Sequence, residues 1–185
     1  MIPRLVLVTD RSQLRLGRSL VRTVRECADA GLEAVLVREH DLEPRSRRAL
    51  VAALAEVDGL SVISSRIPDE AADGVHLAAR QAPVAGWWGR SCHAPEEVRR
   101  AAEEGASWVT LSPYAASASK PRYGPALPPD AFAGHPLPVL ALAGVEVGNA
   151  AAAVGNGAHG VAVMGAVMRS DDPAAVVAAL VRELA

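Results

Sequence analysis

Short runs of aliphatic and β-branched residues alternate along the chain with longer segments in which Ala, Leu and Arg recur at helical spacing. The short runs are bounded by Gly, Pro, Asp or Ser, which is typical of strands in βα units. We predict eight strands, at Leu5–Thr9, Ala34–Arg38, Leu60–Ser64, Gly74–Leu77, Gly86–Ser91, Trp108–Ser112, Val139–Ala143 and Gly160–Met164. This alternation indicates a parallel sheet of the α/β class.

The longer segments predict helices between most of these strands. They cover Leu16–Ala30, Pro44–Val57, Pro95–Glu104, Val147–Gly155 and Pro173–Leu184. Gly31, Gly105 and Gly157 follow helix ends, where glycine commonly serves as the C-cap. The segments after the third, fourth and sixth strands are short or irregular, so we expect shortened helices or loops there.

Eight such units in 185 residues favour one compact domain, residues 1–185, built as a closed (β/α)8 TIM barrel. An open flavodoxin-like sheet is the alternative, and it would require two or three of the weaker strands to be loops. The first strand is not followed by a GxGxxG motif, which argues against a dinucleotide-binding sheet.

Composition and charge narrow the class of partner. Hydrophobic residues make up 50% of the chain but aromatic residues only 3%, so Ala, Val and Leu must fill the core. The formal net charge is −2 and no basic block is interleaved with aromatic residues, which argues against nucleic-acid binding and favours a small-molecule partner. No apolar run approaches the roughly 18 residues that span a bilayer, so we expect a cytoplasmic protein without a membrane partner.

The ends of the last two predicted strands carry the clearest sign of a ligand site. Active sites of parallel barrels lie at the C-terminal ends of the strands, and the loops after strands seven and eight commonly bind phosphate. Gly144, Met164 and Gly165 occupy those loops here, where glycine permits close approach of a phosphate to the backbone. Alternatively, Gly144 and Gly165 only allow the chain to turn and bind no phosphate.

Seven sequence blocks follow one another along nearly the whole chain. They are LVLVTDR at 5–11, VREHD at 37–41, ADGVHL at 72–77, GRSCHAPEEV at 89–98, SKPRYGPAL at 119–127, PVLALAGV at 138–145 and GAHGVAVMGAVMRSDDP at 157–173. Their content and order resemble the thiamin phosphate synthase/TenI superfamily. The resemblance implies two activities: joining a pyrimidine diphosphate to a thiazole phosphate with Mg²⁺, or isomerising a thiazole carboxylate phosphate without metal.

The sequence departs from the synthase at the positions that would bind the metal ion. The carboxylates implied after strand three and after the ADGVHL block correspond to Ser64-Ser65 and to residues 78–81, which carry none. The implied lysine after the Arg-Glu pair corresponds to His40. The block GRSCHAPEEV is closer to the TenI form, so we expect no cofactor, with Mg²⁺ needed only if the synthase reaction holds.

The isomerase activity requires a general base, for which histidine is the usual type. The histidine that the resemblance implies after strand six corresponds to Ser112-Pro113, so we expect His93 and Cys92 to act instead, the Cys92 thiolate being stabilised by Arg90. We expect substrate and phosphate to be bound by Arg38, Ser64, Ser91, Lys120, Gly144, Met164 and Gly165.

Three functional hypotheses remain open from the sequence. The first is a metal-independent, TenI-like protein that binds a thiazole phosphate or a similar phosphorylated heterocycle and isomerises it. The second is a diverged thiamin phosphate synthase. The third is a non-catalytic paralogue that still binds the phosphorylated ligand. The resemblance favours a homodimer.

Overall fold

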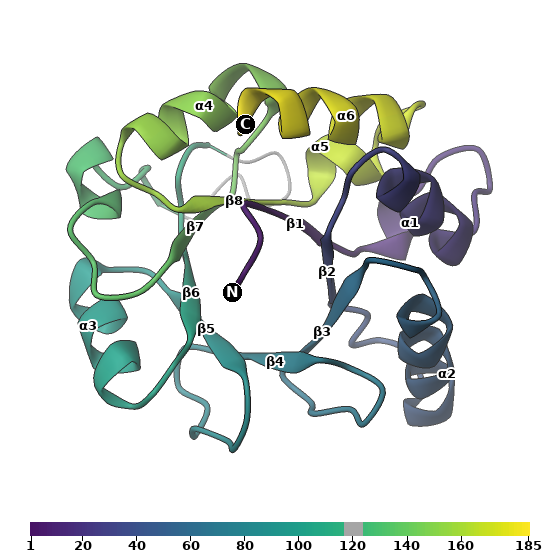
Figure 1. Ribbon diagram of the computed structural model, residues 1–185, viewed down its shortest axis with the longest axis horizontal. Helices are drawn as coiled ribbons and strands as arrows, with labels where there is room; N and C mark the ends of the chain where they lie inside the picture. Colours follow the sequence, from purple (N-terminus) through teal and green to yellow (C-terminus); the bar gives the residue numbers. More distant parts are fainter. Residues whose placement is uncertain (117–123) are drawn as a thin grey trace.

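Eight parallel strands close into a barrel, and each strand pairs with its neighbours in sequence (Figure 1). The computed structural model describes residues 1–116 and 124–185. The strands are β1 (Leu5–Val8), β2 (Ala34–Val37), β3 (Ser61–Ser65), β4 (Gly74–Leu77), β5 (Trp88–Cys92), β6 (Trp108–Leu111), β7 (Val139–Leu142) and β8 (Gly160–Val163). Pairing of β1 with β8 closes the barrel, so the (β/α)8 prediction is confirmed and the open-sheet alternative is wrong.

Helices surround the barrel on its outside (Figure 1). They are α1 (Leu20–Asp29), α2 (Pro44–Ala55), α3 (Pro95–Glu103), α4 (Val147–Gly155), α5 (Gly165–Met168) and α6 (Pro173–Glu183), with short 3-10 turns η1 (Arg11–Gln13) and η2 (Pro129–Phe132). The connections from β3 to β4 and from β4 to β5 contain no helix, as the irregular sequence there predicts. Helix α1 begins later than predicted because Leu16 and Gly17 adopt positive φ angles of 58° and 63°.

The alternation of side chains along each strand separates two cores. Residues that face outward pack against the helices, while residues that face inward fill the barrel. The interior cluster consists of Ile2, Val6, Val8, Ala34, Leu36, Ile63, Trp108, Leu140 and Ala162. Because a one-residue shift along a strand exchanges the two faces, the register decides which polar residues can reach a site in the barrel mouth.

Trp108 is the largest side chain buried inside the barrel, and it is 0% exposed. A Cβ atom at Gly89, its register partner on β5, would overlap the indole ring. The N-terminal residues also enter the interior, since Ile2 is 3% exposed and the chain starts over the barrel opening in Figure 1. The Trp108 ring, packed opposite Gly89, therefore fills the barrel interior below the mouth of the barrel.

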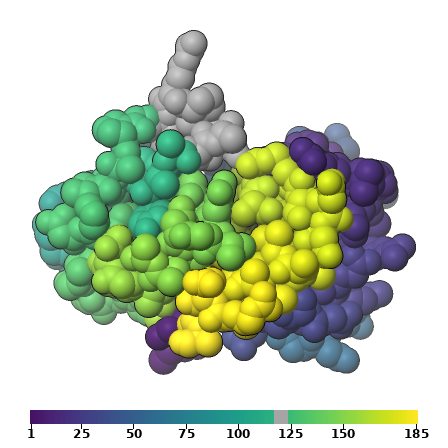
Figure 2. Space-filling model, turned by 90° about the horizontal axis from the view of Figure 1, so that it is seen from above, coloured from purple at the N-terminus to yellow at the C-terminus, as the bar shows by residue number. Residues whose placement is uncertain are grey.

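The outer helices form a continuous layer where the chain ends meet. In Figure 2, α6 (yellow) lies between α4 (green) and the N-terminal third of the chain, and α6 contacts both α1 and α4. Gly31, Gly105 and Gly157 adopt φ angles of 101°, 89° and 100° after helix ends, which confirms their prediction as C-caps. None of the helices in residues 1–116 and 124–185 is long and apolar enough to cross a membrane.

Candidate active site

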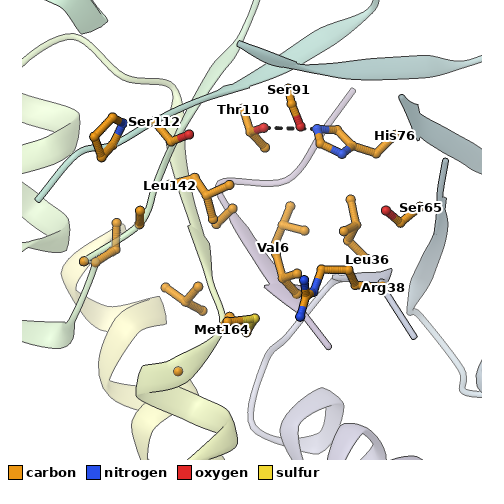
Figure 3. Close-up of a pocket in the computed structure, with 18 of the residues that line it drawn as sticks. Val6, Leu36, Arg38, Ser65, His76, Ser91, Thr110, Ser112, Leu142 and Met164 are labelled. Atoms are coloured by element: carbon orange, nitrogen blue, oxygen red, sulfur yellow. Dashed lines mark hydrogen bonds between the residues drawn. The ribbon is translucent and has the colours of Figure 1, made fainter. Parts of the chain in front are cut away.

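A cavity of about 340 Å³ opens at the C-terminal ends of the strands. Its walls come from the inward positions of the strands and from the loops that follow them. In Figure 3, Ser65, His76, Ser91 and Thr110 form an arc of polar side chains around the apolar side chains of the barrel interior. The cavity therefore combines an apolar floor with polar groups that can orient a ligand.

Basic side chains line the cavity after β2 and β3. They are Arg38, His40 and Arg66. Arg38 Nη2 lies 3.0 Å from Asp10 Oδ2, and the Arg38 side chain is 43% exposed. Ser65 is 5% exposed, and its Oγ lies 3.3 Å from His40 Nε2. This edge of the cavity presents hydrogen-bond donors and positive charge.

Asp10 loses its proton more readily than a free aspartate. Burial opposes its ionisation, but hydrogen bonds from Ser12 and Gln13 and the Arg38 charge outweigh that effect and lower the pKa of Asp10. The Asp10 carboxylate also accepts a hydrogen bond from the Ser12 backbone and so caps η1. Asp10 thus anchors the Arg38 guanidinium at the rim of the cavity.

The opposite edge of the cavity is formed by the loops after β7 and β8. Gly144, Met164, Gly165 and Arg169 line it. Gly144 has a φ of 69°, and a Cβ there would overlap the backbone of Ala115 and Ala116, so this glycine is required by the loop geometry itself. A Cβ on Gly165 would overlap the Arg169 guanidinium, so glycine lets this cation approach the backbone.

His76 lies at the bottom of the cavity. Its ring stacks on Trp108 with centroids 5.0 Å apart, and its Nε2 lies 3.0 Å from Thr110 Oγ1 (Figure 3). Burial lowers the pKa of His76 to about 4. His76 is therefore neutral at physiological pH and serves as a hydrogen-bonding group of the cavity floor.

The low pKa of His76 makes stability depend on pH. Between about pH 6.5 and pH 4 the unfolded chain binds a proton at this position that the folded chain does not bind, so acidification through this window destabilises the fold. We expect the free energy of unfolding to fall by about 2 kcal/mol more in the wild type than in His76→Gln between pH 7 and pH 5. Urea unfolding of both proteins at the two pH values measures this difference, and equal losses would contradict the assignment.

His93 directly follows β5, and its ring reaches Ser112, which directly follows β6. Its Nδ1 lies 3.1 Å from Ser112 Oγ and 3.2 Å from the Ser112 carbonyl oxygen. The His93 backbone N–H donates to Glu97 Oε2 at 2.6 Å, which fixes the loop to the first turn of α3. Both His93 and Ser91 line the cavity, so the structure brings them together as the sequence predicts.

Cys92 does not line the cavity, so the prediction that it acts as a base is wrong. It alternates with Ser91 along β5 and therefore faces the helices, where its side chain is 0% exposed. Burial raises the pKa of the Cys92 thiol to about 12, with Glu97 adding to the effect and Arg90 opposing it. Arg90 itself pairs with Glu104 instead of activating the thiol.

Ser64 also faces away from the cavity. Its Oγ accepts a hydrogen bond of 3.0 Å from the buried Arg47 and donates to the Ile67 carbonyl. Ser65 takes the inward position instead, because it lies two residues after Ile63, which faces the barrel interior. Lys120, also predicted to bind substrate, lies outside the described residues.

Among the described residues, the predicted set missed eight polar side chains that line the cavity, namely His40, Ser65, Arg66, His76, Thr110, Ser112, Glu146 and Arg169. Ser65 and Thr110 could have been found from strand alternation once the register was known. Arg66 directly follows β3, so its position at a strand exit was the available signal, whereas Arg169 follows α5, a turn that the sequence pattern did not predict.

The residues at the positions of the implied metal ligands do not suit Mg²⁺. This ion prefers carboxylate oxygens, but Ser65, Ala78 and Ala79 occupy the cavity wall where the resemblance implies acids. Within the described part of the chain, Glu146 is the one carboxylate that lines the cavity, and it lies on the β7 side. The described residues also contain no cluster of three His, Cys, Asp or Glu side chains suited to a metal.

Comparison with known proteins identifies the family. The family model described as thiamine monophosphate synthase matches residues 5–167. The thiamine-phosphate synthase of Thermus thermophilus is 35% identical over 192 residues, covering 94% of this chain and 93% of the relative. That of Roseiflexus castenholzii is 34% identical over 193 residues, covering 94% of this chain and 84% of the relative.

Solved structures agree on the fold. The thiamine phosphate pyrophosphorylase from Pyrococcus furiosus superposes with a TM-score of 0.81 at 23% identity, covering 98% of this chain and 95% of that one. A 3-hexulose-6-phosphate synthase superposes with a TM-score of 0.76 at 14% identity, covering 99% of this chain and 100% of that one. The matched model, the two sequence relatives and the barrel together show that this chain belongs to the thiamine monophosphate synthase family.

Proposed function

We propose that the protein is a transferase that joins a pyrimidine diphosphate to a thiazole phosphate. The observation that carries this proposal is the pair of edges described above, which we call the arginine edge (Arg38, His40 and Arg66) and the glycine edge (Gly144, Gly165 and Arg169). Arg66 and Gly144 lie across one cavity, because β3 and β7 are separated by three strands on either side of the barrel. Two anion-binding edges suit two phosphorylated substrates whose reacting atoms meet between them.

The relatives favour transfer over isomerisation. Proteins at 34% and 35% identity over more than nine-tenths of the chain carry the name thiamine-phosphate synthase. The sequence blocks alone placed the isomerase first, because the metal carboxylates are missing. Transfer is therefore the better-supported reaction, and the missing carboxylates are a difference from the relatives within that reaction.

The proposed reaction forms one carbon–nitrogen bond and breaks one carbon–oxygen bond. The thiazole nitrogen contributes its lone pair to the pyrimidine methylene carbon, and pyrophosphate leaves with the electron pair of the broken bond. The arginine edge stabilises the charge that develops on the leaving group, since preorganised cations act most strongly where charge accumulates. Val6, Leu36 and Leu142 keep water from the reacting carbon.

Purified protein tests this proposal directly. With both substrates present we expect thiamin phosphate and pyrophosphate to appear in equal amounts, and with either substrate alone we expect neither. The reaction is run once with Mg²⁺ and once with EDTA, so that transfer can be detected whether or not it needs a metal ion. Tight binding of both substrates without turnover would contradict transfer and support a non-catalytic paralogue.

A metal-free isomerase is the second candidate, and the position of His93 favours it. The resemblance implies a catalytic histidine after strand six, and the His93 ring reaches Ser112 at that strand exit from the neighbouring strand. A histidine there can move a proton to or from a thiazole ring. Accelerated isomerisation of thiazole carboxylate phosphate that His93→Ala abolishes would establish this function, whereas isomerisation unaffected by His93→Ala would remove the role of His93.

A further inference from the structure

The arginine edge is backed by a third guanidinium group, which is buried inside the protein. Arg47 projects from α2 and is 4% exposed. Its Nη2 donates to the carbonyl oxygens of Val37 and Ser65, each at 3.1 Å, as well as to Ser64 Oγ. Arg47 thus ties the C-terminal end of β2 to that of β3, directly beneath Arg38 and Ser65.

Arg47 is not neutralised by an ion pair. Within the described residues no carboxylate oxygen lies within 4.0 Å of its guanidinium, and its Nε has no hydrogen-bond partner. Burial is the main cause that lowers the pKa of Arg47, with Asp69 and Glu39 opposing it from a distance. A buried cation without a counterion is costly, and an anion placed in the cavity near it would offset that cost.

The nearby acids are engaged elsewhere. Glu39 accepts hydrogen bonds from the Arg11 backbone and guanidinium at 2.9 and 2.8 Å, and Asp41 binds the same guanidinium at 2.7 Å. Asp10 pairs with one nitrogen of Arg38. Arg66, which lines the cavity, has no ion pair among the described residues, so no contacting carboxylate neutralises its charge there.

We propose that Arg38, His40 and Arg66, with Arg47 behind them, form a diphosphate site that needs no divalent cation. We call these four residues the cationic site. The proposal rests on the proposed transfer reaction and adds to it that side chains of this chain neutralise the leaving group.

Two features indicate a diphosphate as the ligand class. Two guanidinium groups of the arginine edge, those of Arg38 and Arg66, reach the cavity, and a guanidinium group can donate two parallel hydrogen bonds to phosphate oxygens. Ser65 and His40 stand where carboxylates and a lysine are implied by the family, so an acidic metal-binding surface is replaced by uncharged or basic donors. The burial of His40, together with the charges of Arg66, Arg47 and Arg38, lowers the pKa of His40, and the Glu39 charge opposes this shift.

Titration with inorganic pyrophosphate tests the site. Calorimetry is run on the full chain, once with EDTA and once with Mg²⁺. We expect binding with EDTA, a dissociation constant within about threefold in Mg²⁺, and weakening of about tenfold in Arg66→Gln, since charged hydrogen bonds of this kind are worth a factor of this order. Arg80→Gln is the matched control, because Arg80 is exposed and does not line the cavity, and it should bind pyrophosphate like the wild type.

A second pair of variants tests the buried cation. Arg47→Lys should keep most of the pyrophosphate affinity, and Arg47→Met should lose about tenfold while the near-ultraviolet circular dichroism stays native. Arg48→Gln on the same helix is exposed and serves as the control. If Arg47→Met does not fold, the comparison of Arg66→Gln with Arg80→Gln still decides the proposal.

Pyrophosphate that binds only with Mg²⁺, or that binds Arg66→Gln as tightly as the wild type, would overturn the metal-free site. This result is independent of turnover. Failure to form thiamin phosphate would refute the proposed transfer, while metal-free pyrophosphate binding would still establish the cationic site.

Discussion

Replacing Arg38 with glutamine is expected to lower kcat/KM of the transfer reaction about 100-fold, because removing one preorganised donor from developing charge costs a factor of this order. Arg38 lines the cavity at the end of β2, and Asp10 holds its guanidinium at 3.0 Å. Glutamine keeps a neutral donor but loses the charge and the forked geometry. Steady-state rates of thiamin phosphate formation measure the loss.

The matched control for Arg38→Gln is Arg45→Gln. Arg45 is an exposed arginine in the first turn of α2 and does not line the cavity, so the same change of charge there should leave kcat/KM within about twofold. A loss below threefold in Arg38→Gln, or equal losses in both variants, would show that Arg38 does not contact the reacting substrate.

Replacing Trp108 with alanine is expected to reduce the free energy of unfolding by about 3–5 kcal/mol, which is typical when a buried tryptophan is truncated. The indole is 0% exposed and packs against Gly89 and the His76 ring, and Gly89 has no side chain that could move into the space left by the indole. Since native domains are stable by only about 5–15 kcal/mol, this variant should be close to unfolding. Urea denaturation measures the change.

Trp108→Phe is the control for that experiment. The indole Nε1 has no hydrogen-bond partner in the described structure, so the loss of the N–H group itself should cost little, and the phenyl ring keeps much of the volume. We expect Trp108→Phe to lose less than half of what Trp108→Ala loses. A loss of less than about 1 kcal/mol in Trp108→Ala would contradict the role of Trp108 as the barrel's interior filling.

The barrel could be predicted from the sequence because its determinants are local. Each strand is an apolar run, and helices such as Val147–Gly155 match their predicted range. The misplaced boundary of α1 has a backbone cause, since Leu16 and Gly17 adopt left-handed conformations that the apolar spacing of the segment does not reveal.

The candidate site could be predicted only in part, because it depends on strand register. Successive residues of a strand face opposite sides, so Ser65 and Ser91 face the cavity, whereas the predicted Ser64 and Cys92 face away from it. Arg38, Ser91, His93, Gly144, Met164 and Gly165 do line the cavity, and their roles in binding or catalysis remain predictions.

The positions of the buried Arg47 and of Arg169 could not be predicted from the spacing of residues in the sequence. Arg47 lies in an arginine-rich helix whose other arginines, Arg45 and Arg48, are exposed, so only the packing of α2 on β3 selects it. Arg169 reaches the cavity because α5 turns the chain back over Gly165. Both side chains owe their positions to contacts between distant segments.

A structure of the protein with thiazole phosphate and inorganic pyrophosphate tests the central claim, that one cavity binds two anions at opposite edges. The account predicts the thiazole phosphate group beside Gly144, Gly165 and Arg169, and pyrophosphate against Arg38 and Arg66 without a metal ion between them. Both anions at one edge, or either of them outside the barrel mouth, would contradict it.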